Sequence, residues 1–242
     1  MPRRWLVSFI ISVAIACASE AKYSGKLAWL PSLRLFRRHS EEAISAFMKE
    51  IADSPFNHDD PGITAKHPLM TSPSRPQVPN GMKPLRCLHG AQVYDRAVQI
   101  GLRESQMVNR ATWIKLLVPQ PNARRWKEGM PVVTLAKSYG IIWSANPCRL
   151  VHVHWNRVIP PDMGKGKYSS FGFSTVRGHL IAGEERFSVE WRAEDSTVWL
   201  DLYSVSRGSG VLGKVAMPLV RGIQKAFFAT LSRQMLELVS EA

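Results

Sequence analysis

The 242-residue chain has the length of one well-packed domain with short extensions and is too short for two comfortable domains. Hydrophobic residues at 45% and charged residues at 21% are ordinary globular values, which exclude a disordered protein. The 32 basic and 19 acidic residues give a net charge of +13, but the basic residues are scattered without an aromatic-interleaved motif, so nucleic-acid binding is disfavoured. The three cysteines lack metal-ligand spacing, and a disulfide between Cys87 and Cys148 stays open.

Residues 1–21 combine a basic start with an apolar run of about 14 residues and small residues at its end, the pattern of a secretory signal peptide. We therefore expect a linker over residues 22–31 and a single domain over residues 32–242, exported to the periplasm or secreted. The run is shorter than the roughly 20 residues of a membrane-spanning helix, so no stable span is expected. Two alternatives remain, a short membrane anchor and a cytoplasmic protein whose true start lies downstream. N-terminal sequencing separates the three, because cleavage predicts a mature chain that begins near Lys22.

A short amphipathic helix is predicted from Ser40 to Ile51, because a serine N-cap precedes two acidic residues and the apolar residues share one face. Residues 55–84 contain seven prolines and therefore predict a long loop. Four residues of this loop are of types that bind metals, but no helix or strand fixes their spacing, so we expect them to be solvated: His58, Asp59, Asp60 and His67.

A second helix is predicted from Ala91 to Val108. Four short runs with strand-like patterns follow it: Trp113–Val118, Pro131–Ala136, Gly140–Trp143 and Arg149–Trp155. On the last of these, His152 and His154 share one face of the strand. Two such histidines can bind a metal, but they are more typical of a polar-lined surface, so no metal site is expected.

The most specific stretch of the chain is a pair of strands and the loop between them. Tyr168–Val176 and Arg186–Trp191 alternate as half-buried strands do, whereas Arg177–Glu185 contains two glycines and predicts a loop. A further strand is predicted from Ser196 to Ser206. Because short turns join these strands, we expect antiparallel pairing between sequence neighbours.

One long helix ends the chain. It is predicted to begin at Lys214 or Pro218 and to reach about Val239, with a continuous apolar stripe: Leu219, Ile223, Phe227, Leu231, Met235 and Leu238. Only a sheet of several strands offers a surface long enough to cover this stripe. The sequence therefore predicts an α+β fold in which a curved antiparallel sheet is closed by a long C-terminal helix.

Several spaced motifs occur in order in the second half of the chain: FGFSTVRGHLIAGEERFSVEW, STVWLDLYSVSR and MPLVRGIQKAFFATLSRQML. Together they resemble the DUF1990 family, whose pattern runs through a G-H loop, a G-E-E-x-F strand, a Val-Trp strand, a Ser-Arg pair and a closing helix with an R-x-x-Q core. The resemblance covers roughly residues 32–238, although Leu180 and Gly208 stand where the family usually has proline. More distantly, the architecture is similar to the START and birch-pollen-allergen superfamily, which implies a helix-grip-like fold that holds apolar ligands between helix and sheet.

Two functions of different classes follow. The preferred one is non-catalytic binding of a small apolar or amphipathic ligand, without a cofactor, in a cavity lined by aromatic residues: Phe171, Phe173, Phe187, Trp199 and Phe227. The alternative is an enzyme in which His179 and a glutamate, Glu184 or Glu185, act as acid and base. Neighbouring strand residues point to opposite faces, so the two glutamates cannot share one cavity. We expect Arg207 or Arg221 to pair with the inward glutamate, which makes Arg207 a fourth candidate catalytic residue.

Overall fold

The computed structural model describes residues 34–35, 38–66, 85–119, 126–138, 140, 142–179 and 181–241. The expected signal peptide and linker lie outside these residues. The helical elements are α2 (Glu41–Ile51), α3 (Ile63–Lys66), α4 (Ala91–Arg96), the π-helix η2 (Ala97–Arg103), α5 (Gln106–Asn109), the 3-10 helix η3 (Pro161–Met163) and α6 (Gly210–Ser240). The strands are β1 (Arg34–Leu35), β2 (Leu85–His89), β3 (Ile114–Leu117), β4 (Pro131–Ser138), β5 (Ile142–Val158), β6 (Gly166–Thr175), β7 (Ile181–Arg192) and β8 (Thr197–Gly208).

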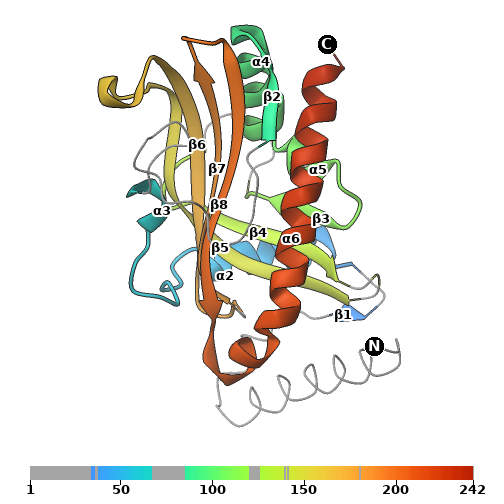
Figure 1. The fold of residues 1–242 in the computed structure, drawn as a ribbon. Helices are drawn as coiled ribbons and strands as arrows, with labels where there is room; N and C mark the ends of the chain where they lie inside the picture. The colour runs from blue at the N-terminus through green and yellow to red at the C-terminus, as the bar shows by residue number, and fades with distance from the viewer. Residues whose placement is uncertain are drawn as a thin grey trace.

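The described strands form one antiparallel sheet with the order β2-β8-β7-β6-β5-β4-β3, and β1 pairs with β5 beyond the end of β6. The expected pairing of sequence neighbours is confirmed from β3 to β8. Within the described chain the path is open and does not close into a barrel. Figure 1 shows that the sheet is strongly bent, with α6 laid along one side of it. The fold is therefore α+β, as predicted, with an antiparallel sheet and a long C-terminal helix.

Strand β7 begins earlier than the sequence predicts. It starts at Ile181, so Glu184 and Glu185 lie inside a strand, and the connection from β6 is shorter than the predicted loop. Gly183 is the reason for the difference. A Cβ atom on this residue would lie 2.1 Å from the carbonyl oxygen of Val205, so the glycine permits a close backbone approach between β7 and β8.

Alternation along the strands gives the sheet two different faces. On β7, Phe187 points toward α6, and we name this side the helix face. Ser188 points to the opposite side, which we name the polar face. The pairing of β5 with β6 shifts between Leu150 and His152, so His152 lies on the polar face although Leu150 lies on the helix face.

Helix α6 covers the helix face (Figure 1). It begins at Gly210, earlier than predicted, so that Pro218 lies inside the helix rather than in its first turn. In the second half of the helix the predicted stripe is buried in the main core: Phe227, Leu231, Met235 and Leu238. In the first half, Leu219 and Ile223 are only half-buried. The stripe is thus buried in the C-terminal half of α6 and only half-buried in its N-terminal half.

The other side of the sheet is covered by the first described part of the chain. Ile44, Met48 and Ile51 of α2 pack on β4 and β5 in a second core cluster. Farther along, Phe56 forms a bridge with Val176, and α3 lies against β7 and β8. Because both faces of β7 are covered, neither of its two adjacent glutamates lies at the open surface.

Cys148 is a buried free thiol, so the disulfide with Cys87 is not formed. Three strands separate β2, which contains Cys87, from β5, which contains Cys148. Burial raises the pKa of the Cys148 thiol well above its usual range.

None of the described helices is long and apolar enough to cross a membrane.

Candidate functional site

A buried group of polar side chains occupies the polar face over β5 to β8, and we name it the polar cluster. Its members are each at most 4% exposed: His152, Ser170, Ser174, Glu184, Arg186, Ser188, Glu190 and Asp201. Strand pairing sets them in rows, so that His152 and Arg186 flank Gly172 on neighbouring strands. Charged side chains are almost never fully buried unless they are paired, so each charge of the polar cluster is expected to have partners.

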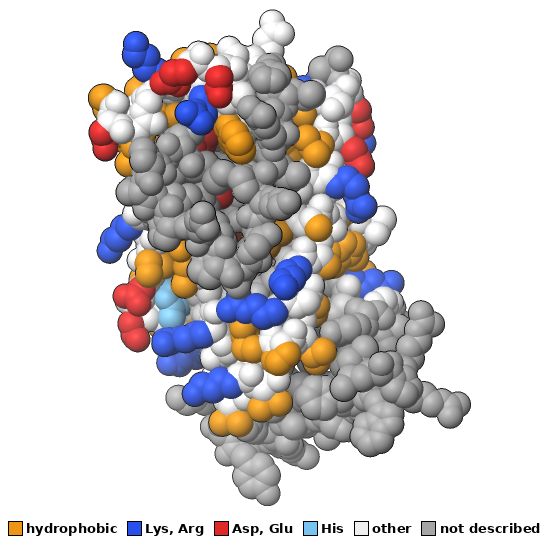
Figure 2. All heavy atoms as spheres, in the orientation of Figure 1, with side chains coloured by type: hydrophobic (Ala, Val, Ile, Leu, Met, Phe, Trp, Pro, Cys, Tyr) orange, Lys and Arg blue, Asp and Glu red, His pale blue; other side chains and the backbone are white. Residues whose placement is uncertain are grey.

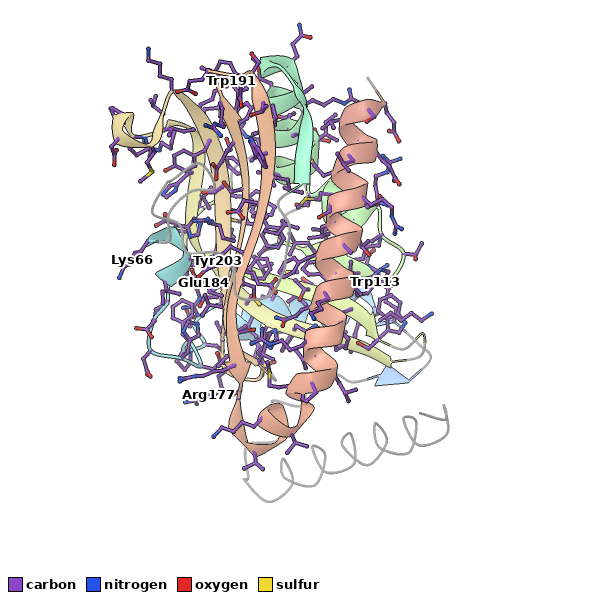
Figure 3. The ribbon with its side chains drawn as sticks, viewed as in Figure 1. Lys66, Trp113, Arg177, Glu184, Trp191 and Tyr203 are labelled. Carbon is purple, nitrogen blue, oxygen red and sulfur yellow. The ribbon has the colours of Figure 1, made fainter. Side chains whose placement is uncertain are left out.

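Arg186 lies in the middle of the polar cluster. Its Nη2 atom donates to Oδ2 of Asp201 at 2.7 Å, and its Nη1 atom donates to the carbonyl oxygen of Thr64 at 2.9 Å. The guanidinium carbon lies 5.6 Å from the centroid of the Tyr203 ring. Figure 3 shows Tyr203 and Glu184 together on the side of the sheet where α3 lies. The ion pair is desolvated, so its contribution to the free energy of unfolding depends on these surrounding contacts.

Glu184 is held by N–H and hydroxyl donors. Its carboxylate accepts hydrogen bonds from the backbone nitrogens of Gly62 at 2.6 Å and Thr64 at 2.8 Å, and another from the Thr64 hydroxyl. Among the described residues, neither Arg207 nor Arg221 pairs with Glu184 or Glu185, so the predicted pairing of the inward glutamate is wrong. Three donors at the start of α3 already satisfy the charge, and hydrogen bonds to a carboxylate are among the strong ones.

Two members of the polar cluster have no hydrogen-bond partner among the described residues. Both ring nitrogens of His152 and the Oγ atom of Ser188 are buried and unpaired. The imidazole lies directly over Gly172, where a Cβ atom would be 2.2 Å from its Cε1 atom. Burial, with smaller effects of His154 and Arg186, lowers the pKa of His152 to about 3, so the ring is neutral at pH 7. In the described ranges, no three His, Cys, Asp or Glu side chains are grouped to hold a metal ion.

Glu185 lies on the helix face, on the opposite side of β7 from Glu184. Burial raises the pKa of its carboxyl group to about 7, and a hydrogen bond with Gln224 opposes this shift. Gln224 also donates to Oγ of Ser206 at 3.2 Å, and Arg221 donates to the carbonyl oxygen of Ser206 at 2.8 Å. The sheet and α6 therefore hold between them a carboxyl group that titrates near neutrality.

His179 and Arg207, the other two candidate catalytic residues, do not complete an acid–base site. The Nδ1 atom of His179 accepts a hydrogen bond from the nitrogen of Ile181 at 3.1 Å, and burial lowers its pKa to about 4. The neutral ring thus stabilises the turn between β6 and β7, and no hydrogen bond between described residues links it to either glutamate. Arg207 is 71% exposed, and its Nη2 atom lies 3.9 Å from Oδ2 of Asp59.

The aromatic residues expected to line an apolar cavity are divided between the two faces. Four of them pack together in the core of the helix face: Phe171, Phe173, Phe187 and Phe227. The rings of Phe171 and Phe187 stack with centroids 4.9 Å apart, and Phe187 meets Phe227 edge to face at 6.3 Å. Trp199 lies on the polar face, where it pairs with Glu190 across β7 and β8.

Glutamine substitutions at the two adjacent glutamates are expected to change stability in opposite directions. Glu184→Gln should lower the free energy of unfolding by about 2 kcal/mol, because its amide cannot accept from every donor that now faces the carboxylate. Glu185→Gln should raise it by about 1–3 kcal/mol near pH 8, because a neutral amide replaces a carboxylate that burial disfavours.

The effect of Glu185→Gln depends on pH. The folded protein, in which this pKa is raised from 4.5 to about 7, keeps a proton that the unfolded chain releases. Wild-type stability should therefore fall as the pH rises from about 4.5 to 7, and the advantage of the glutamine should vanish near pH 4. Urea denaturation of both variants near pH 4 and near pH 8 measures these changes. A Glu185→Gln variant that is less stable than wild type near pH 8 would contradict the assignment.

Sequence reasoning did not single out the polar cluster. The available signal was the alternation along β7, which sets Glu184, Arg186, Ser188 and Glu190 on one side and apolar residues on the other. Such a pattern usually marks a solvated face. Here that face is buried, in part by Thr64 from a segment more than a hundred residues away in the chain.

Known proteins share this arrangement of motifs. The model of DUF1990, a domain of unknown function, matches residues 75–234, which contain β2 to β8 and most of α6. A UPF0548 protein of Deinococcus radiodurans is 31% identical over 146 residues, which are 60% of this chain and 71% of that protein. A UPF0548 protein of Arabidopsis thaliana is 32% identical over 99 residues, which are 40% of this chain and 46% of that protein. The resemblance predicted from the motifs is confirmed, and the chain belongs to the DUF1990 family.

Proposed function

We propose that the protein is a non-catalytic binder of a small amphipathic molecule, whose polar end is held in the polar cluster. The observation that carries this proposal is the pair of buried, unpaired side chains, His152 and Ser188. Buried polar atoms in folded proteins nearly always have a partner, and an unsatisfied one costs about 1–3 kcal/mol. Two such groups on one face of a sheet, beside the Arg186–Asp201 ion pair, are explained by a partner molecule that satisfies both.

The chemistry of these atoms favours a neutral polar group on the ligand. A neutral imidazole donates from one nitrogen and accepts at the other, and a serine hydroxyl does both. Because the pKa of His152 is about 3, the ring offers no positive charge to an anion. The carboxylates of Glu184 and Asp201 are already hydrogen-bonded. A hydroxyl or carbonyl group fits this site, because it can pair with the imidazole and the hydroxyl without bringing a further charge into the buried cluster.

The apolar part of the ligand is expected to contact aromatic rings on the same face. Tyr168 and His154 are half-buried there, with ring centroids 6.0 Å apart in an edge-to-face arrangement. Trp199 occupies this face as well, so it keeps the ligand-binding role predicted from the sequence.

We also propose that the sheet and α6 form a helix-grip-like fold. The packed rings between sheet and α6 favour the polar face as the ligand site.

Native mass spectrometry of the protein as purified tests this function. The wild-type protein is expected to carry a small organic molecule, seen as a mass difference between native and denaturing spectra. His152→Phe keeps a ring but removes both nitrogens, and Ser188→Ala removes the hydroxyl, so both variants should lose the molecule. Ser204→Ala is the matched control, because its Oγ atom is also buried and unpaired among the described residues but lies on the helix face.

The outcomes separate a ligand site from a structural feature. Loss of the molecule from His152→Phe and Ser188→Ala, with retention in Ser204→Ala, supports the site. An unliganded wild-type protein, or a molecule bound equally by all variants, contradicts it. In that case Ser188→Ala should be as stable as wild type or more stable, because it removes a buried hydroxyl without a partner.

A further inference from the structure

The first half of α6 presents an unusual stripe to solvent. Val211 and Val215 are 74% and 56% exposed, and Lys214 and Lys225 are exposed on the same side of the helix. The helix contains no Asp or Glu before Glu237. Solvent-facing helix surfaces of soluble proteins usually mix charges of both signs. A stripe of valine and lysine without a carboxylate therefore indicates a surface that binds a partner.

The start of α6 is also unfavourable for the helix itself. The first turn of a helix carries a partial positive charge, which acidic residues and a capping side chain usually offset. The first turn of α6 contains no acidic residue, and the side chain of Ser209 makes no capping hydrogen bond. Lys214 then adds a positive charge near the same end. This positive end is not neutralised within α6, which suits contact with an anionic surface.

Other exposed basic side chains lie near the start of α6 without belonging to this stripe. Arg207 is 71% exposed at the end of β8, directly before the helix, where it lies on the polar face with Asp59 3.9 Å away. Figure 3 shows Arg177 at the same lower end of the molecule. In Figure 2, blue basic and orange apolar side chains are interspersed over the lower half of the view, whereas red acidic side chains lie mainly above and to the left.

We propose that this stripe of α6, a docking surface defined by Val211, Lys214, Val215 and Lys225, binds the headgroup region of an anionic lipid bilayer. The valines would enter the boundary between headgroups and acyl chains, while the basic side chains contact anionic headgroups. The net charge of +13 adds long-range attraction to such a surface. A single-stranded nucleic acid fits less well, because its bases stack on exposed aromatic rings and both phenylalanines of α6 are buried. The inference is independent of the ligand site on the polar face.

Co-sedimentation with lipid vesicles tests the docking surface. The full chain is expected to bind vesicles of phosphatidylcholine and phosphatidylglycerol, to bind pure phosphatidylcholine weakly, and to dissociate as salt is raised. Lys214→Gln with Lys225→Gln should lower the partition coefficient roughly 30-fold at low salt, since each lysine near an anionic surface contributes about fivefold. Val211→Ser with Val215→Ser should lower it with little change in salt dependence. All four side chains are exposed, so these variants should fold.

A matched control separates a local surface from net charge. Lys66→Gln with Lys165→Gln removes the same charge from exposed positions on α3 and before β6, and should leave binding nearly unchanged. Equal losses in the two lysine pairs, no binding to anionic vesicles, or binding unaffected by the α6 variants would each overturn the proposal. Tighter binding to a labelled single-stranded RNA than to vesicles, unaffected by the valine substitutions, would overturn it in favour of a nucleic-acid partner.

Discussion

Phe227→Ala is expected to lower the free energy of unfolding by about 3–5 kcal/mol, because both the transfer energy of the ring and a cavity term are lost. Phe227 is 6% exposed and contacts rings from three directions. Its centroid lies 6.3 Å from that of Phe187, 6.4 Å from that of Trp113 and 5.5 Å from that of Phe228. Chemical denaturation followed by circular dichroism measures the loss.

Phe227→Leu is the matched control for this substitution. It keeps an apolar side chain of intermediate size and should cost less than Phe227→Ala, about 1–2 kcal/mol. A cost of about 1 kcal/mol or less for Phe227→Ala would contradict a packed interface between α6 and the sheet. An apolar cavity at that interface, as first expected from the sequence, would then become the better candidate for the ligand site.

Arg186→Met is expected to destabilise the protein by about 3–5 kcal/mol, because it leaves the carboxylate of Asp201 buried without its cation. Methionine has a similar length and keeps apolar contacts with the Tyr203 ring. The loss should appear in urea denaturation as a lower midpoint with an unchanged slope.

The double variant Arg186→Met with Asp201→Leu tests the origin of that cost. Removing both charges avoids an unpaired buried ion, so the double variant should recover at least about half of the stability lost in the single variant. Additive losses would contradict the account, since they would mean that Arg186 contributes through contacts other than its ion pair with Asp201.

The fold was largely predictable because its strands and last helix follow regular patterns. Alternation along β6 to β8 and the apolar stripe of α6 indicate a meander covered by a helix, and the structure has both. The boundaries of the elements were less predictable, because a glycine in a sequence usually indicates a turn or a loop. Gly183 belongs to a strand interior, where it permits the approach of β8, and that requirement depends on a partner strand the local sequence does not specify.

The candidate site was less predictable than the fold because it depends on long-range burial. The sequence indicates that Glu184 and Glu185 face opposite sides of a strand, which is the observed arrangement. It does not indicate that both sides are covered. The partner of Glu184 is also hidden, because backbone N–H groups of Gly62 and Thr64 replace the arginine that buried charge usually requires.

The two glutamates of the family motif make contacts on opposite sides of β7, so the motif has a structural role. Glu184 contacts the start of α3 on the polar face, while Glu185 contacts Gln224 of the R-x-x-Q core on the helix face. One strand thus ties the sheet to α3 on one side and to α6 on the other. The opposite stability effects predicted for the two glutamine variants follow from this difference in surroundings.

The most direct test of the ligand site is the electron density beside His152 and Ser188 in a crystal structure of the protein as purified. We expect density for an organic molecule with a hydroxyl or carbonyl oxygen within about 3 Å of a His152 ring nitrogen and of Ser188 Oγ. Its apolar part should extend toward Tyr168 and Trp199. Density for water alone, or for atoms of the protein itself against these two side chains, would contradict the account.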